Sequence, residues 1–409
     1  MNQKIYDKIA DLLLYSVNFR EGDKIRLALD FNCREIARSL AYRAYARGAS
    51  WVELEYRDQF LQAAAIAGTV SEFTFPAYLH TKLMEGLEPG WKSIAVLSEA
   101  EADVFEGLPT DRSTAYFRAY QKSREPRMKA LMNNQFPWTL TYVPSPHMVS
   151  LAFPDLSPEE GMNKYWEAVI KVMHLDADDP VQVWHEKMLA DEKRTALIND
   201  LKPVSLHFKG PGTDLTVGLN AGARWIGGYD YTTSGERFIT NIPTEEIFTS
   251  PDCRKVEGRV RLTRPFVMHA NLGPIPRNAW FEFREGRVTD FGADQGRETL
   301  EAFFQLDERS VYTGEIALVD PCSAIASTGM TYYNGLHDEN AACHLAFGKA
   351  YPFTLTEQRP RSDEELLAMG MNVSTVHEDA MIGGPEVDVT AVLADGTRKD
   401  LIRGGKYLI

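Results

Sequence analysis

The 409-residue sequence has only four cysteines, and no two of them form a Cys-x-x-Cys pair. This spacing excludes a zinc ribbon, a dithiol redox motif and a disulfide framework, and it predicts buried free thiols at Cys33, Cys253, Cys322 and Cys343. No run approaches the roughly 18 apolar residues that a membrane-spanning helix needs. Residues 1–17 lack the small-residue cleavage site of a secretory signal. We therefore expect a cytoplasmic protein with no membrane partner.

Positive charge is also scarce, with 44 Lys and Arg against 58 Asp and Glu, a net charge of −14 and a pI near 5.2. This balance argues against nucleic acid as the main partner, because phosphate backbones bind basic surfaces. Hydrophobic residues make up 44% and charged residues 25%, which is typical of a folded globular chain. At roughly 150 residues per domain, the length predicts two or three domains.

Several familiar catalytic and nucleotide-binding motifs are missing. Gly210-Pro211-Gly212 lacks the third glycine of a dinucleotide loop, and the sequence has no Walker loop and no Gly-x-Ser-x-Gly elbow. His185-Glu186 begins like a zincin helix, but Leu189 stands where the second histidine must be. A nucleotide-binding α/β protein is therefore only a remote alternative, and a zincin-type zinc site at His185 is excluded.

Helix and strand patterns alternate through the first half of the chain. The apolar spacing predicts helices over residues 5–17, 34–46, 114–132, 157–175 and 180–201, and strands over 25–29, 51–56, 93–97 and 138–143. Ser157-Pro158 with Glu160 is a capping-box start signal. Alternation at these lengths is typical of an α/β fold with a mostly parallel sheet.

The second half is rich in short strand patterns separated by glycine. Hairpins are predicted around Gly210-Pro211-Gly212 and around Asp395-Gly396. We place a domain boundary near residue 200. The prediction is an N-terminal α/β domain over 1–200 and a C-terminal β-rich α+β domain over 201–409, which binds metal.

Four segments of this second half gather carboxylates and histidines: residues 241–249, 314–319, 338–344 and 376–379. Glu245 and Glu246 are adjacent, so on an extended chain only one of them can face a common site. Glu315 stands at the start of the apolar run 316–319, where functional side chains often lie. Each segment alone also has a plain structural explanation, such as packing, capping or surface charge.

The third and fourth segments suggest which secondary structures carry the two histidines. Asp338 or Asn340 can cap an alanine-rich helix, on which His344 and Tyr351 would share a face. A strand at the fourth segment would place His377 and Asp379 on the same side. Carboxylates on separate strands, a helix histidine and a His-x-Asp strand supply five ligands for two divalent ions of the zinc, cobalt, manganese or magnesium kind. Such a pair lowers the pKa of a shared water, so hydrolysis is the natural chemistry.

At these residues the sequence resembles the thermophilic metalloaminopeptidases of the aminopeptidase T, aminopeptidase II and aminopeptidase S type. The matching motifs are Asn-x-Pro-Thr-Glu-Glu-x-Phe-Thr at 241–249, Gly-Glu-x-Ala-Leu-Val at 314–319, Asp-Glu-Asn-Ala-Ala at 338–342 with His344, Gly348 and Tyr351, and Val-His-x-Asp at 376–379 with Met-Ile-Gly at 381–383. Weaker similarity runs through residues 21–23 and 212–215. The likeness thus spans nearly the whole chain.

The resemblance implies a homodimeric exopeptidase that uses two metal ions to remove N-terminal amino acids from peptides with a free N-terminus. By motif position its metal ligands fall on Glu246, Glu315, His344, His377 and Asp379, and its active-site tyrosine falls on Tyr351. Glu246 is preferred to Glu245 from the spacing to Glu315 in relatives. His337 departs from the apolar or aromatic residue of relatives and could change the polarity of the pocket or add a further ligand.

In the resulting hypothesis, the Tyr351 hydroxyl stabilises the oxyanion and a carboxylate that is not yet identified carries the proton. Glu245 and Glu339 are candidates for binding the ammonium group of the substrate. Two alternatives stay open. One is a metal-dependent amidase or dipeptidase that acts on small substrates, and the other is a dimeric metal-binding scaffold without catalytic activity.

Overall fold

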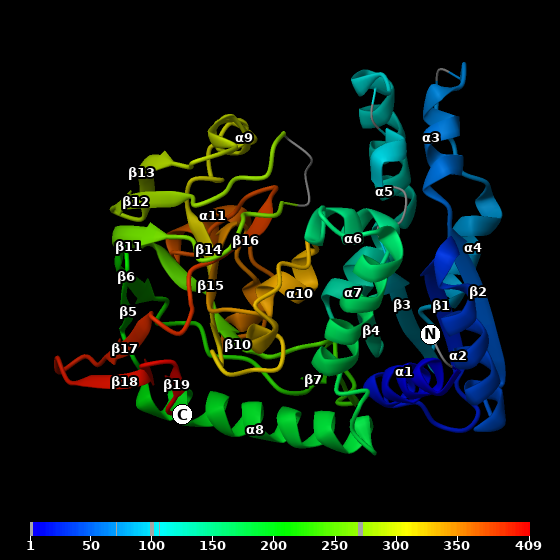
Figure 1. Ribbon diagram of the computed structural model, residues 1–409, viewed down its shortest axis with the longest axis horizontal. Helices are drawn as coiled ribbons and strands as arrows, with labels where there is room; N and C mark the ends of the chain where they lie inside the picture. The colour runs from blue at the N-terminus through cyan, green and yellow to red at the C-terminus, as the bar shows by residue number, and fades with distance from the viewer. Residues whose placement is uncertain (1–2, 71, 99–101, 106, 269–272) are drawn as a thin grey trace. The chain divides into compact units, whose positions relative to one another are not determined.

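The computed structural model describes residues 3–70, 72–98, 102–105, 107–268 and 273–409 (Figure 1). The chain forms two compact units, Met1–His185 with Tyr229–Pro243, and Glu186–Gly228 with Thr244–Ile409. Helix α8 (Pro180–Leu201) passes from the first unit into the second. The domain boundary near residue 200 stays a prediction.

The first unit is built on one five-stranded sheet in which all strand pairs are parallel, in the order β2-β1-β3-β4-β9. The strands are β1 (Lys24–Asp30), β2 (Trp51–Arg57), β3 (Trp91–Leu97), β4 (Trp138–Tyr142) and β9 (Asn241–Ile242). The helices are α1 (Gln3–Ser16), α2 (Arg34–Ala46), α3 (Gln59–Ala67), α4 (Ala77–Glu85), α5 (Thr110–Met132), α6 (Pro146–Ala152) and α7 (Pro158–Val172). The predicted parallel sheet is confirmed, and so is the capping box of α7 at Ser157 and Glu160.

The segment that contributes β9 also carries β7 (Asp230–Tyr231) and β8 (Arg237–Phe238), and it holds the half-buried carboxyl group of Asp230. The Thr240 hydroxyl donates a hydrogen bond to Asp230, and burial raises the pKa of Asp230 to about 7 from the usual 3.8. Folding therefore favours the protonated acid. The contribution of Asp230 to stability is full below about pH 4 and is lost as the pH rises towards 7.

Asp230→Asn removes this titration, so its stability relative to the wild type should rise between pH 4 and pH 7. Urea unfolding at several pH values measures the difference, which should vanish at the acid end. Asp214→Asn is the control. Its stability relative to the wild type should fall rather than rise with pH, because Lys209 and His207 hold the pKa of the exposed Asp214 below its usual value. Equal stability curves for Asp230→Asn and the wild type at all pH values would contradict the prediction.

The second unit contains two antiparallel sheets. The larger has the order β13-β12-β11-β6-β5-β17-β18-β19 and the smaller has the order β10-β14-β15-β16. The strands of the larger sheet are β5 (Ser205–Gly210), β6 (Thr213–Leu219), β11 (Pro251–Arg261), β12 (Trp280–Arg284), β13 (Arg287–Gly292), β17 (Asp388–Val392), β18 (Arg398–Arg403) and β19 (Lys406–Tyr407). Both predicted hairpins are confirmed, because β5 pairs with β6 and β17 with β18.

The smaller sheet consists of β10 (Glu246–Thr249), β14 (Thr313–Val319), β15 (His344–Gly348) and β16 (His377–Met381). Helices α9 (Arg297–Phe303), α10 (Gly335–Glu339) and α11 (Asp363–Ala368) complete this unit. The mixed α/β fold class is therefore confirmed, with a parallel sheet in one unit and antiparallel sheets in the other.

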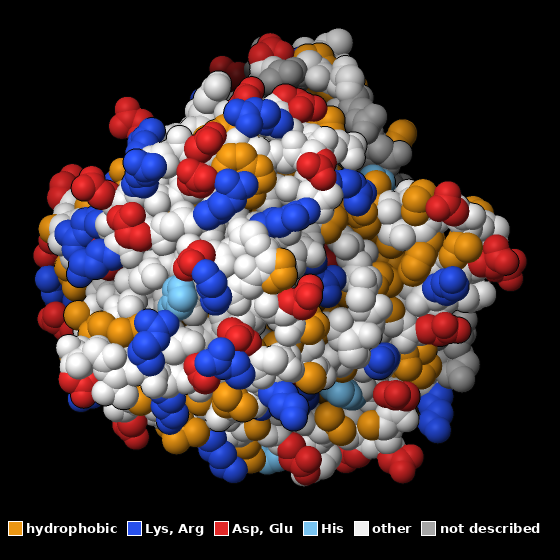
Figure 2. Space-filling view, turned by 60° about the vertical axis from the view of Figure 1, so that its left-hand side comes forward, with side chains coloured by type: hydrophobic (Ala, Val, Ile, Leu, Met, Phe, Trp, Pro, Cys, Tyr) orange, Lys and Arg blue, Asp and Glu red, His pale blue; other side chains and the backbone are white. Residues whose placement is uncertain are grey.

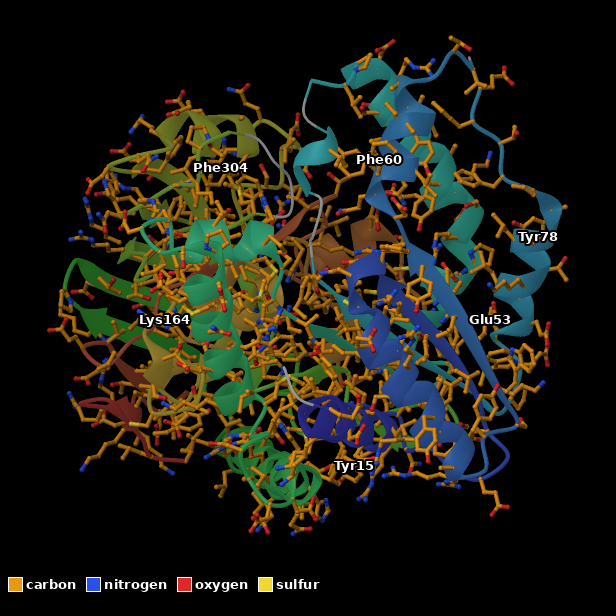
Figure 3. The ribbon with its side chains drawn as sticks, turned by 45° about the vertical axis from the view of Figure 1, so that its right-hand side comes forward. Tyr15, Glu53, Phe60, Tyr78, Lys164 and Phe304 are labelled. Carbon is orange, nitrogen blue, oxygen red and sulfur yellow. The ribbon has the colours of Figure 1, made fainter. Side chains whose placement is uncertain are left out.

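The core of the second unit contains buried residues from both of its sheets. Phe347 of β15 is at its centre, with ring centroids 4.8 Å from Phe281 and 5.5 Å from Phe304. Figure 3 labels Phe304 beside helix α9. This aromatic cluster packs behind the smaller sheet and holds it in place.

The surface of the protein mixes both signs of charge. Figure 2 shows Lys and Arg interspersed with Asp and Glu over the face in view. Among the residues that the structure describes, no helix is both long and apolar enough to cross a bilayer. Cys33, Cys253 and Cys343 are buried free thiols as predicted, but the prediction is wrong for Cys322, which is exposed.

Candidate metal centre

The smaller sheet of the second unit has one polar face and one apolar face. Glu246 of β10 pairs with Val319 of β14, and Ala317 of β14 pairs with His344 of β15. Because side chains alternate along a strand, these pairings put all five predicted ligands on one face: Glu246, Glu315, His344, His377 and Asp379. The opposite face carries Ile247, Ile316, Leu318, Leu345 and Phe347, which belong to the core.

A gap in the middle of this polar face lets the carboxylates converge. Ala346 pairs with Glu315 on one side and with Asp379 on the other, so the three residues form one row across the sheet. Ala346 is fully buried and has only a methyl group. The space above it is therefore left to the two flanking carboxylates.

His344 lies at one end of the cluster, beside Glu246. Its Nε2 is 3.0 Å from Glu246 Oε2, 3.6 Å from Glu315 Oε1 and 3.9 Å from Asp379 Oδ1. Ligand atoms of Glu246, Glu315 and His344 all lie within 4.8 Å of one another, close enough to hold a metal ion.

His377 lies at the other end of the same cluster. Its Nε2 is 3.8 Å from Glu315 Oε2 and 3.5 Å from Asp379 Oδ1. Glu315 and Asp379 thus lie between the two histidines.

Both histidines are oriented by the backbone. Nδ1 of His377 lies 2.7 Å from the Lys349 carbonyl oxygen, and Nδ1 of His344 lies 3.1 Å from the Ala342 carbonyl oxygen. A carbonyl only accepts, so Nδ1 carries a hydrogen and Nε2 is the ring nitrogen that faces the carboxylates, where it would bind a metal ion after losing its proton. Metal-binding histidines are usually oriented in this manner. The donor set therefore fits a divalent ion of borderline hardness.

Burial and neighbouring charge act together on the acids and bases of this cluster. Burial raises the pKa of Glu315, and the charges of Glu246 and Asp379 add to the effect. Burial opposes the charge on His344, but the surrounding carboxylates outweigh it and hold the pKa of His344 well above its usual value. The pKa of His377 is raised in the same way, to about 9. The site thus gathers excess negative charge, which a buried cation would neutralise.

Tyr351, the predicted active-site tyrosine, packs directly on this cluster. Its ring centroid is 4.6 Å from that of His377, and Phe353 stacks on it at 5.1 Å. Burial raises the pKa of Tyr351 well above its usual value, and the charges of Glu315 and Asp379 raise it further. The hydroxyl therefore keeps its proton and can act as a hydrogen-bond donor.

The adjacent Glu245 and Glu246 point to different partners. Glu246 belongs to the cluster, whereas the Glu245 carboxylate pairs with Lys187 of α8, Oε2 to Nζ 2.7 Å. The Glu245 side chain is only 5% exposed, and that of Lys187 is 26% exposed. Sequence reasoning did not single out Lys187, because nothing in its local pattern marks it as a partner of residue 245.

Lys187→Met should destabilise the protein by about 2–3 kcal/mol, since it leaves a buried carboxylate without its counter-charge. Adding Glu245→Gln should recover part of this loss, because the uncompensated charge disappears. Urea unfolding measures both changes. The control is Lys209→Met, which breaks an ion pair that is 60% exposed on both sides and should cost under about 1 kcal/mol. Equal losses for the two lysine variants would contradict the assignment.

Glu339 ends helix α10, five residues before His344. Burial raises the pKa of Glu339 well above its usual value, and the charges of Glu246 and Asp379 raise it further, so its carboxyl group lies in the field of the cluster. Glu339 thus has a different environment from Glu245, whose charge is balanced by Lys187.

His337, on the same short helix, is fully buried. Its Nδ1 lies 2.9 Å from the Asn334 side-chain amide, and its ring lies 5.0 Å from that of Tyr332. Burial lowers the pKa of His337 to about 3, so it is neutral. These contacts lie within residues 332–337 and involve none of the five predicted ligands.

The helix predicted to carry His344 and Tyr351 is wrong. Helix α10 begins after the cap residue Asn334, whose side chain accepts from the His337 backbone amide, and it ends at Glu339. His344 instead begins strand β15, and Tyr351 follows that strand. Ala341 and Ala342 suit a helix locally, but pairing with β14 and β16 overrides this preference. The predicted strand at His377 and Asp379 is confirmed.

Comparison with known proteins agrees with this arrangement. Aminopeptidase T of Thermus aquaticus is 36% identical over 407 residues, which cover 98% of each chain. Aminopeptidase 2 of Geobacillus stearothermophilus is 33% identical over 99% of this chain and 98% of its own. The solved structure of wild-type AmpT from Thermus thermophilus matches with a TM-score of 0.89 and 33% identity, over 99% of both chains. The family described as thermophilic metalloprotease (M29) matches residues 2–407. The chain therefore belongs to the thermophilic metalloprotease family.

Proposed function

We propose that the protein is a metal-dependent aminopeptidase that removes N-terminal amino acids from peptides. The observation that carries the proposal is the convergence of two backbone-oriented histidines and three carboxylates on one face of the smaller sheet. Membership of the metalloprotease family and the names of the full-length relatives support the same activity. The proposed ligands of two divalent ions, zinc, cobalt, manganese or magnesium, are Glu246, Glu315, His344, His377 and Asp379.

When bound, two divalent ions supply a water of lowered pKa and positive charge for the oxygen of the scissile carbonyl. The chain's own residues supply the rest. Glu315 and Asp379 lie between the two histidines and would hold the ions together with them. Tyr351 keeps its proton and is proposed to donate a hydrogen bond to the oxyanion as it forms.

Glu339 is the proposed proton carrier of the reaction. The sequence left the proton carrier unidentified and gave Glu339 and Glu245 only as candidates for binding the ammonium group. Glu339 is chosen here because the charges of the cluster act on its carboxyl group, whereas the charge of Glu245 is balanced by Lys187. A carboxylate held beside the attacked carbonyl can take a proton from the water and pass it to the leaving amine. Glu245 is assigned instead to holding β10 against α8.

The test is hydrolysis of leucine p-nitroanilide and its N-acetylated form by protein stripped with a chelator and reloaded with zinc, cobalt, manganese or magnesium. We expect release only from the free amine and only with metal. Release from small amides but not from unblocked peptides longer than three residues would instead indicate an amidase or dipeptidase. No release, with two ions bound per chain, would indicate an inactive scaffold. The homodimer and the cytoplasmic location stay predictions, and the oligomeric state is measured by analytical ultracentrifugation.

A further inference from the structure

A buried amide links the parts of the candidate site that come from different strands. Asn340 is fully buried, directly after Glu339 and four residues before His344. Its Oδ1 accepts from the Glu245 backbone amide at 2.6 Å. Its Nδ2 donates to the Leu336 carbonyl oxygen at 2.8 Å and to Glu339 Oε1 at 3.3 Å.

These partners determine which way the amide faces. The Glu245 amide can only donate and the Leu336 carbonyl can only accept, so the oxygen and nitrogen of Asn340 cannot be exchanged. Aspartate at this position would keep the acceptor but lose both donated bonds, and it would place a second charge beside Glu339. Alanine would lose all three bonds. The geometry therefore requires an amide at residue 340.

The two sides of this amide reach two different functional groups. Through the Glu245 backbone it fixes the start of β10, where the next residue is the proposed ligand Glu246. Through Nδ2 it fixes the carboxylate of Glu339. Groups that orient ligands from outside the metal's own contacts typically change metal affinity about 10- to 100-fold when they are removed.

We propose that Asn340 is a positioning residue that holds Glu246 in place for metal binding and Glu339 in place for proton transfer. The first half rests on the proposed metal site alone, and the second half rests on the proposed aminopeptidase activity as well. The two halves predict separate losses, one in metal affinity and one in kcat, so each has its own measurement.

The first measurement is the affinity of chelator-stripped protein for zinc, determined by competition with a chromophoric chelator. Asn340→Ala should weaken binding by about 10- to 100-fold. The matched control is Asn220→Ala, which also removes a buried amide that donates to a backbone carbonyl, Met369, and accepts from a backbone amide, Gly222. The control should bind zinc within twofold of the wild type. Equal affinity for Asn340→Ala and the wild type would overturn this half.

The second measurement is kcat at saturating metal in a cycle with Glu339→Gln. Asn340→Asp should lower kcat about 10-fold or more with little change in KM when Glu339 is present. It should have no further effect on top of Glu339→Gln, since the carboxylate it positions is gone. Independent, multiplicative losses would overturn this half and show that Asn340 only supports the fold.

Circular dichroism and thermal unfolding check that each variant folds. If Asn340→Ala does not fold, Asn340→Leu carries the affinity measurement, because leucine fills a similar volume and also removes the acceptor of the Glu245 amide. If the wild type has no aminopeptidase activity, the proposed function fails while the zinc measurement still decides whether Asn340 positions the ligand.

Discussion

His344→Ala is expected to lower kcat/KM by about a thousandfold, which corresponds to about 4 kcal/mol of transition-state stabilisation. The reason is geometric: Nε2 of His344 lies within 4 Å of three carboxylates, from Glu246, Glu315 and Asp379. Removing the imidazole takes away a nitrogen ligand and leaves only carboxylates at that end of the cluster. Asp379→Ala, between the two histidines, should cause a loss of similar size.

Kinetics at saturating metal, together with metal content per chain, measure this effect. His207→Ala is the matched control, because His207 lies on β5 and pairs with the exposed Asp214, outside the cluster. It should keep at least half of the wild-type activity. A folded His344→Ala variant that retains a tenth of the activity would show that His344 is not a ligand.

The second large effect is expected from Ala346→Leu. This substitution places three further carbon atoms between Glu315 and Asp379, in the row where the wild type has a single methyl group. The two carboxylates can then no longer converge, so metal binding should weaken at least about 100-fold, or about 2.7 kcal/mol. The expected loss comes from occupied space alone, because no ligand is removed.

Isothermal titration of chelator-stripped protein with zinc measures the binding. Ala391→Leu is the control, because Ala391 is also a fully buried strand residue, but it lies on β17 within the core. Overpacking there should cost about 1–3 kcal/mol of stability and leave zinc affinity unchanged. Zinc affinity of Ala346→Leu within threefold of the wild type would contradict the role assigned to the gap.

The fold was predictable wherever local patterns and tertiary structure agree. The parallel sheet of the first unit and the hairpins at Gly210–Gly212 and Asp395-Gly396 follow from periodicity and turn residues. The prediction of a helix at His344 was wrong. The alanine-rich residues before His344 favour a helix locally, but His344 pairs with two neighbouring strands, and this pairing decides the structure. Helices α3 and α4 were also not predicted.

The candidate site was predictable as a set of residues but not as a geometry. The alternation of side chains along a strand was enough to put His377 and Asp379 on one face. It could not show that Ala346 separates two carboxylates, that Lys187 pairs with Glu245, or that backbone carbonyls orient both histidines. These relations join residues far apart in the sequence, and only strand register brings them together.

The spread of the cluster along the chain also has a consequence for folding. Its members come from four strands, and Glu246 and Asp379 are separated by more than a hundred residues of sequence. An unfolded chain cannot assemble this donor set, so an ion held there would bind the folded state alone. By mass action, free metal at about a thousand times its dissociation constant would add about 4 kcal/mol to the free energy of unfolding. The metal supply of the cell would then set the lifetime of the folded protein as well as its activity.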